Sequence, residues 1–141
     1  MVEELKSYTS QDLADLDVLM HELSPTSYCN EAILYNVMND NNSHVFVIRE
    51  EGHIIATGTL CIMHMLEFTI AGIESVVVKS NVRGKGYGKE LITHMIHTSN
   101  KEGAHHIQLT SNPLRKTANK LYQSMGFEKY DTNCYKYKII V

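Results

Sequence analysis

Residues 73–88 read I-E-S-V-V-V-K-S-N-V-R-G-K-G-Y-G, and this stretch decides the fold. Its first half, Ile73 to Val78, is short, apolar and β-branched, with Glu74 as its only charge. That pattern predicts a strand buried on both faces in the centre of a sheet. The second half places three glycines and two cations within residues 83–88. Apolar residues then recur at helical spacing, so the stretch predicts a strand, a glycine-rich turn and a helix.

A turn of this kind offers backbone N–H groups and the positive end of a helix dipole to a phosphate. Glycines keep side chains away from the anion and permit the positive φ that a tight path requires. The spacing of Gly84, Gly86 and Gly88 does not match the dinucleotide fingerprint G-x-G-x-x-G, because Lys89 stands at its third glycine. The mononucleotide loop G-x-x-x-x-G-K-[ST] fails as well, because Glu90 follows Gly88-Lys89.

What remains is R-x-x-G-x-G at residues 83–88, directly after a hydrophobic strand. It resembles [QR]-x-x-G-x-[GA], the hallmark of the GNAT superfamily of acyl-CoA-dependent N-acyltransferases. A second stretch, A-N-K-L-Y-Q-S-M-G-F at residues 118–127, is similar to that family's A-x-x-L-Y-x-x-x-G-F. The likeness is clearest from about Thr57 to Phe127, and the order of the predicted elements extends it over the whole chain.

Periodicity and turn residues predict the remaining elements. We expect strands at residues 4–8, 44–49, 53–65, 73–78, 107–110 and 130–141, and helices at 11–23, 30–38, 87–102 and from Asn112-Pro113 to Gly126. Ser10 is the expected N-cap of the first helix. Gly58 indicates a bulge or a close backbone approach. The order β-α-α-β-β-β-α-β-α-β predicts an α/β (α+β) class: one GNAT-like domain over residues 1–141, with a mixed, mostly antiparallel sheet and helices on both faces.

Composition and net charge limit the kinds of partner, cellular location and metal site that we expect. A net charge of −3 argues against a nucleic-acid partner or an anionic membrane surface. No apolar run approaches the ~20 residues of a membrane span, and the acidic start does not resemble a secretory signal, so we expect a cytoplasmic protein. The three cysteines form no C-x-x-C and the paired histidines lack cysteine or carboxylate partners, so we expect no metal.

Four cations, Lys79, Arg83, Lys85 and Lys89, surround the glycine turn. Such a cluster fits either a solvated loop or a polyanion site, and the glycine spacing favours the latter. The resemblance implies that the polyanion is acetyl-CoA as cosubstrate, with its pantetheine arm on the strand backbone and its pyrophosphate on the loop amides. The cofactor-binding residues implied are Val76, Val77, Val78, Arg83, Gly84, Lys85, Gly86, Tyr87, Gly88, Lys89 and Asn119. Asn119 substitutes for a CoA-contacting asparagine of the family, or is simply exposed, because Arg115 stands at the family's usual position.

Two residues are the catalytic candidates. Tyr122 stands at the position of the family's general-acid tyrosine. The alternative is that it only packs in the core, as a tyrosine on the buried face of a helix often does. Glu74 is the candidate base or amine binder, since burial would raise its pKa into a useful range; the alternative is a solvent-facing strand end or an ion pair. The Glu74 strand resembles I-E-D-V-V-V of glucosamine-6-phosphate N-acetyltransferases, but Ser75 replaces their aspartate.

The resemblance implies an N-acetyltransferase that moves the acetyl group of acetyl-CoA directly to a primary amine of a small molecule. Two alternatives stay open. One is acetylation of a protein lysine or N-terminus, although Thr110 lies where such enzymes often carry their base. The other is a non-catalytic acyl-CoA-binding module. The alternating tail, Tyr135 to Val141, leaves an apolar strand edge and indicates a homodimer.

Overall fold

The computed structural model describes residues 1–140. The chain falls into two compact units, the first running from Met1 to Thr110 and the second beginning at Ser111. The first unit contains the sheet and three α-helices, and the second contains one helix, α4 (Lys116–Ser124). That residues 1–141 form a single domain remains a prediction.

The first unit is built on a five-stranded sheet in the order β1-β2-β3-β4-β5. Its strands are β1 (Val2–Glu4), β2 (Ser43–Glu50), β3 (His53–His64), β4 (Thr69–Val78) and β5 (His106–Gln108). The first three pairings are antiparallel and the pairing of β4 with β5 is parallel. The sheet is therefore mixed and mostly antiparallel, as predicted, with a parallel step that needs a crossover connection.

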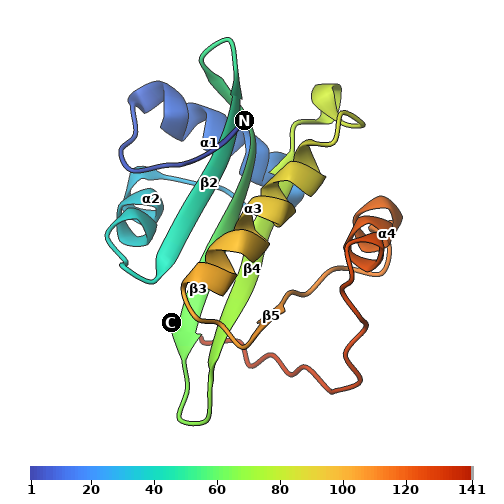
Figure 1. Cartoon of the computed structure of the whole chain (residues 1–141). Helices are drawn as coiled ribbons and strands as arrows, with labels where there is room; N and C mark the ends of the chain where they lie inside the picture. The colour runs from blue at the N-terminus through green and yellow to red at the C-terminus, as the bar shows by residue number, and fades with distance from the viewer. Residues whose placement is uncertain (141) are drawn as a thin grey trace. The chain divides into compact units, whose positions relative to one another are not determined.

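Helices cover both faces of this sheet (Figure 1). α1 (Ser10–Leu23) and α2 (Glu31–Met38) lie on one face, and α3 (Tyr87–Lys101), the crossover helix, lies on the other. Side chains of β2 alternate between the two layers, as the pleat of a strand requires. Val45 and Val47 face α1 and α2, whereas the ring of Phe46 meets the ring of His94 on α3 at a centroid distance of 4.9 Å.

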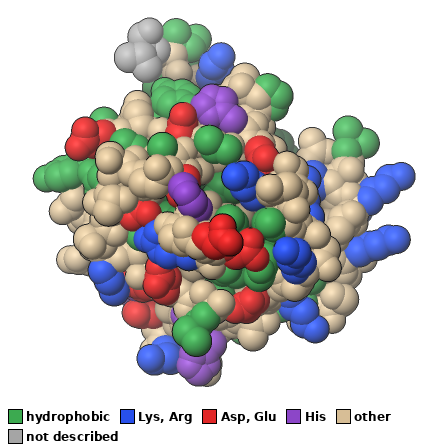
Figure 2. Space-filling model, turned by 90° about the horizontal axis from the view of Figure 1, so that it is seen from above, with side chains coloured by type: hydrophobic (Ala, Val, Ile, Leu, Met, Phe, Trp, Pro, Cys, Tyr) green, Lys and Arg blue, Asp and Glu red, His purple; other side chains and the backbone are tan. Residues whose placement is uncertain are grey.

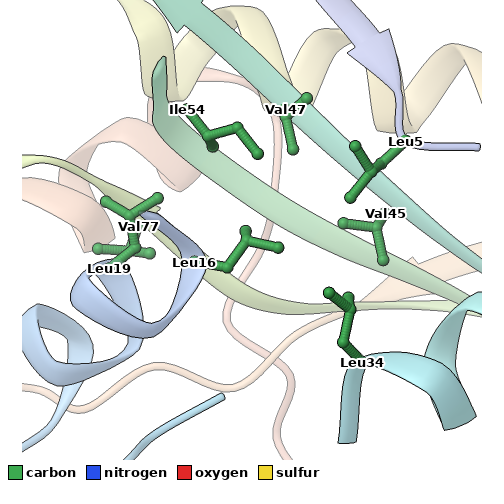
Figure 3. Close-up of a cluster of buried hydrophobic side chains, with 8 residues drawn as sticks. All are labelled: Leu5, Leu16, Leu19, Leu34, Val45, Val47, Ile54 and Val77. Carbon is green, nitrogen blue, oxygen red and sulfur yellow. The ribbon is translucent and has the colours of Figure 1, made fainter. Parts of the chain in front are cut away.

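A cluster of buried side chains joins α1 and α2 to the sheet (Figure 3). Its eight members are Leu5, Leu16, Leu19, Leu34, Val45, Val47, Ile54 and Val77. Burying one such side chain stabilises the fold by roughly 1.5–3 kcal/mol relative to leaving it exposed. Because Val77 belongs to the cluster, the end of β4 that precedes the glycine turn is held against the core.

The ends of several elements differ from the predicted ones. Thr9, and not Ser10, is the N-cap of α1, because its side chain forms a reciprocal capping box with Asp12. α4 begins at Lys116 instead of Asn112-Pro113. There the Asn112 side chain accepts the N–H of Leu114 at 2.9 Å, forming a turn before the helix starts.

The predicted closing strand at residues 130–141 is wrong over its described part. Residues 130–140 form no ladder with any other part of the described chain, and all of them are exposed. A strand requires a neighbour to pair its backbone groups, and alternation of apolar residues alone does not supply one. Val141 lies outside the described residues.

Candidate functional site

β4 carries a bulge opposite Gly58. The ladder pairs Thr57 with Val77 and then Thr59 with Glu74, so two residues of β4 face one glycine of β3. Ser75, in the bulge, has a φ of +53°, which is rare for a residue with a side chain. A Cβ on Gly58 would lie 2.8 Å from Cε of Met95. Both features predicted for Gly58, a bulge and a close approach, are therefore present.

The bulge changes the exposure of the organising strand. Glu74 and Ser75 are exposed, whereas Ile73 and Val77 on either side of them are buried. The prediction that this strand is buried on both faces is therefore wrong at its middle, and the expected desolvation of the Glu74 carboxylate does not apply. Glu74 instead presents an accessible carboxylate on β4, and its catalytic role stays a prediction.

Beyond Gly72, the edge of β4 that faces β5 pairs with no strand among residues 1–140. Only residues 70–72 pair with β5, through residues 106–108. At the other edge, Lys79 donates its N–H to the carbonyl of Ile55 on β3 at 2.8 Å. Because successive backbone groups of a strand point to opposite edges, the N–H of Val78 lies at the open edge. An extended ligand has unpaired strand backbone available there.

The glycine turn leads directly into the N-terminus of α3. Gly84 and Gly86 have φ values of +83° and +85°, which only glycine adopts without strain, and Gly86 is the N-cap. Glu90 makes the first helical hydrogen bond, to the Gly86 carbonyl at 3.0 Å, so the N–H groups of residues 87–89 precede it. No side chain among the described residues caps this end. The turn therefore combines open backbone donors with the positive end of the α3 dipole.

Exposed cations border these donors. Arg83 donates from Nε to the Val78 carbonyl at 2.9 Å, which ties the turn to the end of β4. Lys85 Nζ lies 4.0 Å from Oε1 of Glu50, at the end of β2. Lys89 is exposed and makes no ion pair among residues 1–140. Figure 2, which looks down on the end of the molecule at the top of Figure 1, shows basic and acidic side chains next to one another.

Glu50 is the residue that sequence reasoning missed. It accepts a hydrogen bond from the hydroxyl of Tyr87, and this bond raises the pKa of Tyr87 above its ordinary value. Glu50 belongs to the β2–β3 hairpin, far from the glycine turn in sequence, and no motif contains it. Its only signal in the sequence is an acidic pair, Glu50-Glu51, at the hairpin turn.

The other two predicted site residues, Tyr122 and Asn119, lie on α4 of the second unit. Tyr122 is 7% exposed and its ring meets that of Phe127 edge-on at 6.0 Å. Burial raises the pKa of Tyr122, while the nearby Arg115 charge opposes the rise. Tyr122 therefore keeps its proton at neutral pH. Asn119 donates from Nδ2 to the carbonyls of Asn112 and Arg115, at 2.9 and 2.8 Å, so its donors are engaged within α4 and the preceding turn.

Among residues 1–140, no group of three or more His, Cys, Asp or Glu side chains is arranged to hold a metal ion.

The sequence model of the acetyltransferase (GNAT) family matches residues 10–127, most of the chain. The chain belongs to the GNAT family. No curated protein matches it significantly. The GNAT match spans both units, and it includes the bulged strand, the glycine turn and α4.

Solved structures share this GNAT fold. A protein of Agrobacterium tumefaciens assigned as an acetyltransferase superimposes with a TM-score of 0.85 at 25% identity, covering 98% of this chain and 99% of the other. A glucosamine-6-phosphate N-acetyltransferase of Arabidopsis thaliana gives 0.79 at 22% identity, covering 97% and 98%. An aminoglycoside acetyltransferase from an uncultured soil sample gives 0.81 at 22% identity, covering 100% and 96%. At 22% identity, the glucosamine-6-phosphate and aminoglycoside acetyltransferases are evidence for a shared fold alone.

Proposed function

We propose that this protein is an N-acetyltransferase that moves the acetyl group of acetyl-CoA to a primary amine of a small molecule. One observation supports it most: within residues 1–140, the edge of β4 beyond Gly72 pairs with no strand and runs into a glycine turn whose N–H groups at the start of α3 have no side-chain cap. An acyl-CoA carries an extended amide-containing arm and a diphosphate. The strand edge suits the arm and the helix N-terminus suits the diphosphate.

In this proposal the cofactor is bound mainly by backbone. Residues 76–78 pair with the pantetheine arm, and the amides of residues 84–89 receive the diphosphate. Arg83, Lys85 and Lys89 add positive charge around the phosphates. Asn119 is proposed to contact the cofactor through its carbonyl oxygen, because both of its N–H donors are engaged locally.

The reaction needs three functions. The amine attacks the thioester carbonyl carbon, and the oxyanion that forms accepts a hydrogen bond from the N–H of Val78. Glu74 takes the ammonium proton or binds the ammonium before attack. The C–S bond then breaks, and Tyr122 donates its proton to the departing thiolate of CoA. The second proton lost by the acetylated nitrogen restores the Tyr122 phenol, and Glu74 releases the first one to solvent. The products are the N-acetylated amine and CoA.

A small amine is the proposed acceptor. Two proteins of the same fold, at low identity, are an aminoglycoside acetyltransferase and a glucosamine-6-phosphate N-acetyltransferase, both named for small amino compounds. The exposed carboxylate of Glu74 suits a cationic amine that arrives from solvent. We further propose that the protein is cytoplasmic, where acetyl-CoA is at hand.

The decisive experiment is calorimetric titration with acetyl-CoA, followed by a panel of amines with CoA release as the readout. Gly86→Glu should abolish acetyl-CoA binding, because it places an anion and a strained side chain in the turn. Gly103→Glu is the matched control. Gly103 also has a positive φ and open space around its missing Cβ, but it lies at the other end of α3.

Failure of the unmodified protein to bind acetyl-CoA would contradict the proposal. Binding without turnover across the amine panel would instead support the non-catalytic acyl-CoA-binding module.

A further inference from the structure

Glu50 connects the β2–β3 hairpin to both sides of Gly86. Its Oε1 accepts the hydrogen bond of the Tyr87 hydroxyl, and the same oxygen lies 4.0 Å from Nζ of Lys85. Lys85 and Tyr87 flank Gly86, the N-cap of α3. One carboxylate from the sheet therefore contacts the turn on both sides of the residue at which the helix starts.

Apart from the hydrogen bond of Arg83 to the Val78 carbonyl at its start, the glycine turn has few contacts of its own that would hold its conformation. Gly84 and Gly86 carry no side chains, and both adopt positive φ. Within residues 1–140, no side chain caps α3. Glycine loses more conformational freedom on ordering than any other residue. A contact from outside the turn that reduces this loss raises the affinity for any ligand that needs the turn ordered.

Two roles for Glu50 predict opposite effects on anion binding. If its charge dominates, Glu50 repels the phosphates and its removal tightens binding. If its hydrogen bond dominates, its removal loosens binding. The contacts favour the second role. The Glu50 side chain is 38% exposed, so solvent screens its charge toward the phosphates, whereas its hydrogen bond from the Tyr87 hydroxyl is partly buried and of the stronger, charge-assisted kind.

We propose that Glu50 is a positioning residue: it holds Tyr87, and with it the first turn of α3, in the orientation that binds the diphosphate of an acyl-CoA. Glu50 acts through Tyr87 and does not itself touch the ligand. This inference rests on the proposed function, because it assigns a support to the same cofactor site.

The test measures CoA binding to the full chain by titration calorimetry. Tyr87→Phe and Glu50→Ala each remove the hydrogen bond and should raise the Kd for CoA about tenfold. Glu50→Gln keeps an acceptor for the Tyr87 hydroxyl, so it should raise the Kd less than about threefold. The double variant Glu50→Ala with Tyr87→Phe should bind no more weakly than either single variant, because both remove one interaction.

Glu51→Gln is the control for charge. Glu51 is next to Glu50 in the hairpin turn, is exposed, and makes no ion pair or side-chain hydrogen bond among the described residues. Its substitution removes the same charge and should leave the Kd unchanged. A second readout needs no ligand. Hydrogen exchange of the amides of residues 84–89 should be faster in Tyr87→Phe and Glu50→Ala than in the unmodified protein or Glu51→Gln.

Tighter CoA binding by Glu50→Ala overturns the positioning role and identifies the carboxylate as a repulsive charge. Additive losses in the double variant, or a Kd and an exchange rate that no variant changes, also overturn it while leaving the proposed function intact. If the unmodified protein binds no CoA, the proposed function and this inference fail together.

Discussion

Tyr122 and Glu74 stand in opposite surroundings, one buried and the other exposed. Burial raises the pKa of Tyr122 above its ordinary value, so the folded protein favours the protonated phenol. The resulting stabilisation is present at neutral pH and is lost as the pH rises through the raised pKa. A proton donor is therefore available throughout the physiological range.

If Tyr122 protonates the departing thiolate, Tyr122→Phe removes only the hydroxyl and keeps the ring against Phe127. Affinity for acetyl-CoA should change little, while kcat should fall on the order of 10²-fold or more. Steady-state kinetics with the best amine of the panel measure both quantities. Tyr130→Phe, at an exposed position of the same unit, is the control. Full kcat in Tyr122→Phe would make Tyr122 a packing residue.

The substitution Glu74→Gln distinguishes two roles of Glu74: a general base that removes the ammonium proton, and a group that only binds the ammonium. If Glu74 takes the ammonium proton, the loss of kcat/KM should be greatest near neutral pH. It should shrink as the pH approaches the amine pKa of about 10, where solution already supplies the free amine. A pH profile of kcat/KM checks this, with Glu128→Gln, another exposed carboxylate, as the control. A loss of equal size at every pH would mean that Glu74 only positions the amine.

At the residue scale, the sequence predicts the backbone conformation where a motif determines it. It does not predict contacts between residues that are distant in the sequence. The sequence predicts that the glycines of the turn need positive φ, and Gly84 and Gly86 have it, whereas Gly88, inside α3, does not. At the level of sequence, exposure of Glu74 is only the alternative to burial, because a bulge shifts the alternation of side chains and an apolar run does not reveal which of its members is displaced. Glu50 was missed because the residue it contacts, Tyr87, is distant in sequence.

Among the elements, β3, β4 and α3 meet at Gly58. A Cβ there would lie 2.8 Å from Cε of Met95, a side chain with no exposed surface, and 3.4 Å from Cγ2 of Val76 in the bulge. Gly58→Ala should therefore lower the free energy of unfolding by about 1–3 kcal/mol, the usual range for an overpacked core. Chemical denaturation with a constant m-value checks this.

The cause can be separated with Met95→Leu, which removes the atom that the new Cβ would meet. In the Met95→Leu background, Gly58→Ala should lower the free energy of unfolding by clearly less, because substitutions at neighbouring residues are coupled. Equal costs in both backgrounds would show that strain at the bulge, and not Met95, resists the side chain.

The elements that sequence predicted well are those whose pattern repeats several times. α3 has a long apolar stripe, and the helix ends within one residue of the predicted position, with Gly103 at a positive φ beyond it. β1 and β5, at three residues each, are shifted from their predicted positions, because so short a pattern has no period to fix its register. The tail at residues 130–140 alternates well but lacks a pairing partner within the described chain.

At the scale of the whole molecule, the predicted homodimer depends on this tail. Tyr135, Tyr137 and Ile139 are 87%, 87% and 73% exposed and alternate along the chain. An apolar alternating segment without a partner is suited to pair with a second copy. Light scattering at micromolar concentration should give a dimeric mass, and Tyr137→Lys with Ile139→Lys should reduce it to a monomeric mass. Lys136→Ser with Lys138→Ser, at the intervening positions, should leave it unchanged, and a monomeric unmodified protein would exclude the dimer.

None of the helices in the described range is both long and apolar enough to cross a bilayer.

Fold class, family and the order of the elements up to α4 all followed from the sequence, because two spaced motifs constrain the middle and end of the chain at once. The identity of the acceptor did not follow, since the segments expected to shape its pocket, residues 24–30 and 63–70, match no motif.

The short parallel ladder between β4 and β5 bears on the order in which the sheet assembles. β2, β3 and β4 follow one another through tight turns, so their pairing closes short loops and forms early. β5 must wait until residues 79–105 have folded across the sheet, and it then gains only three residue pairs. We therefore expect β5 to dock last and to detach first. A ligand lying along the adjacent edge of β4, as proposed for acetyl-CoA, would slow that detachment, so the protein should resist proteolysis better when the ligand is bound than when it is absent.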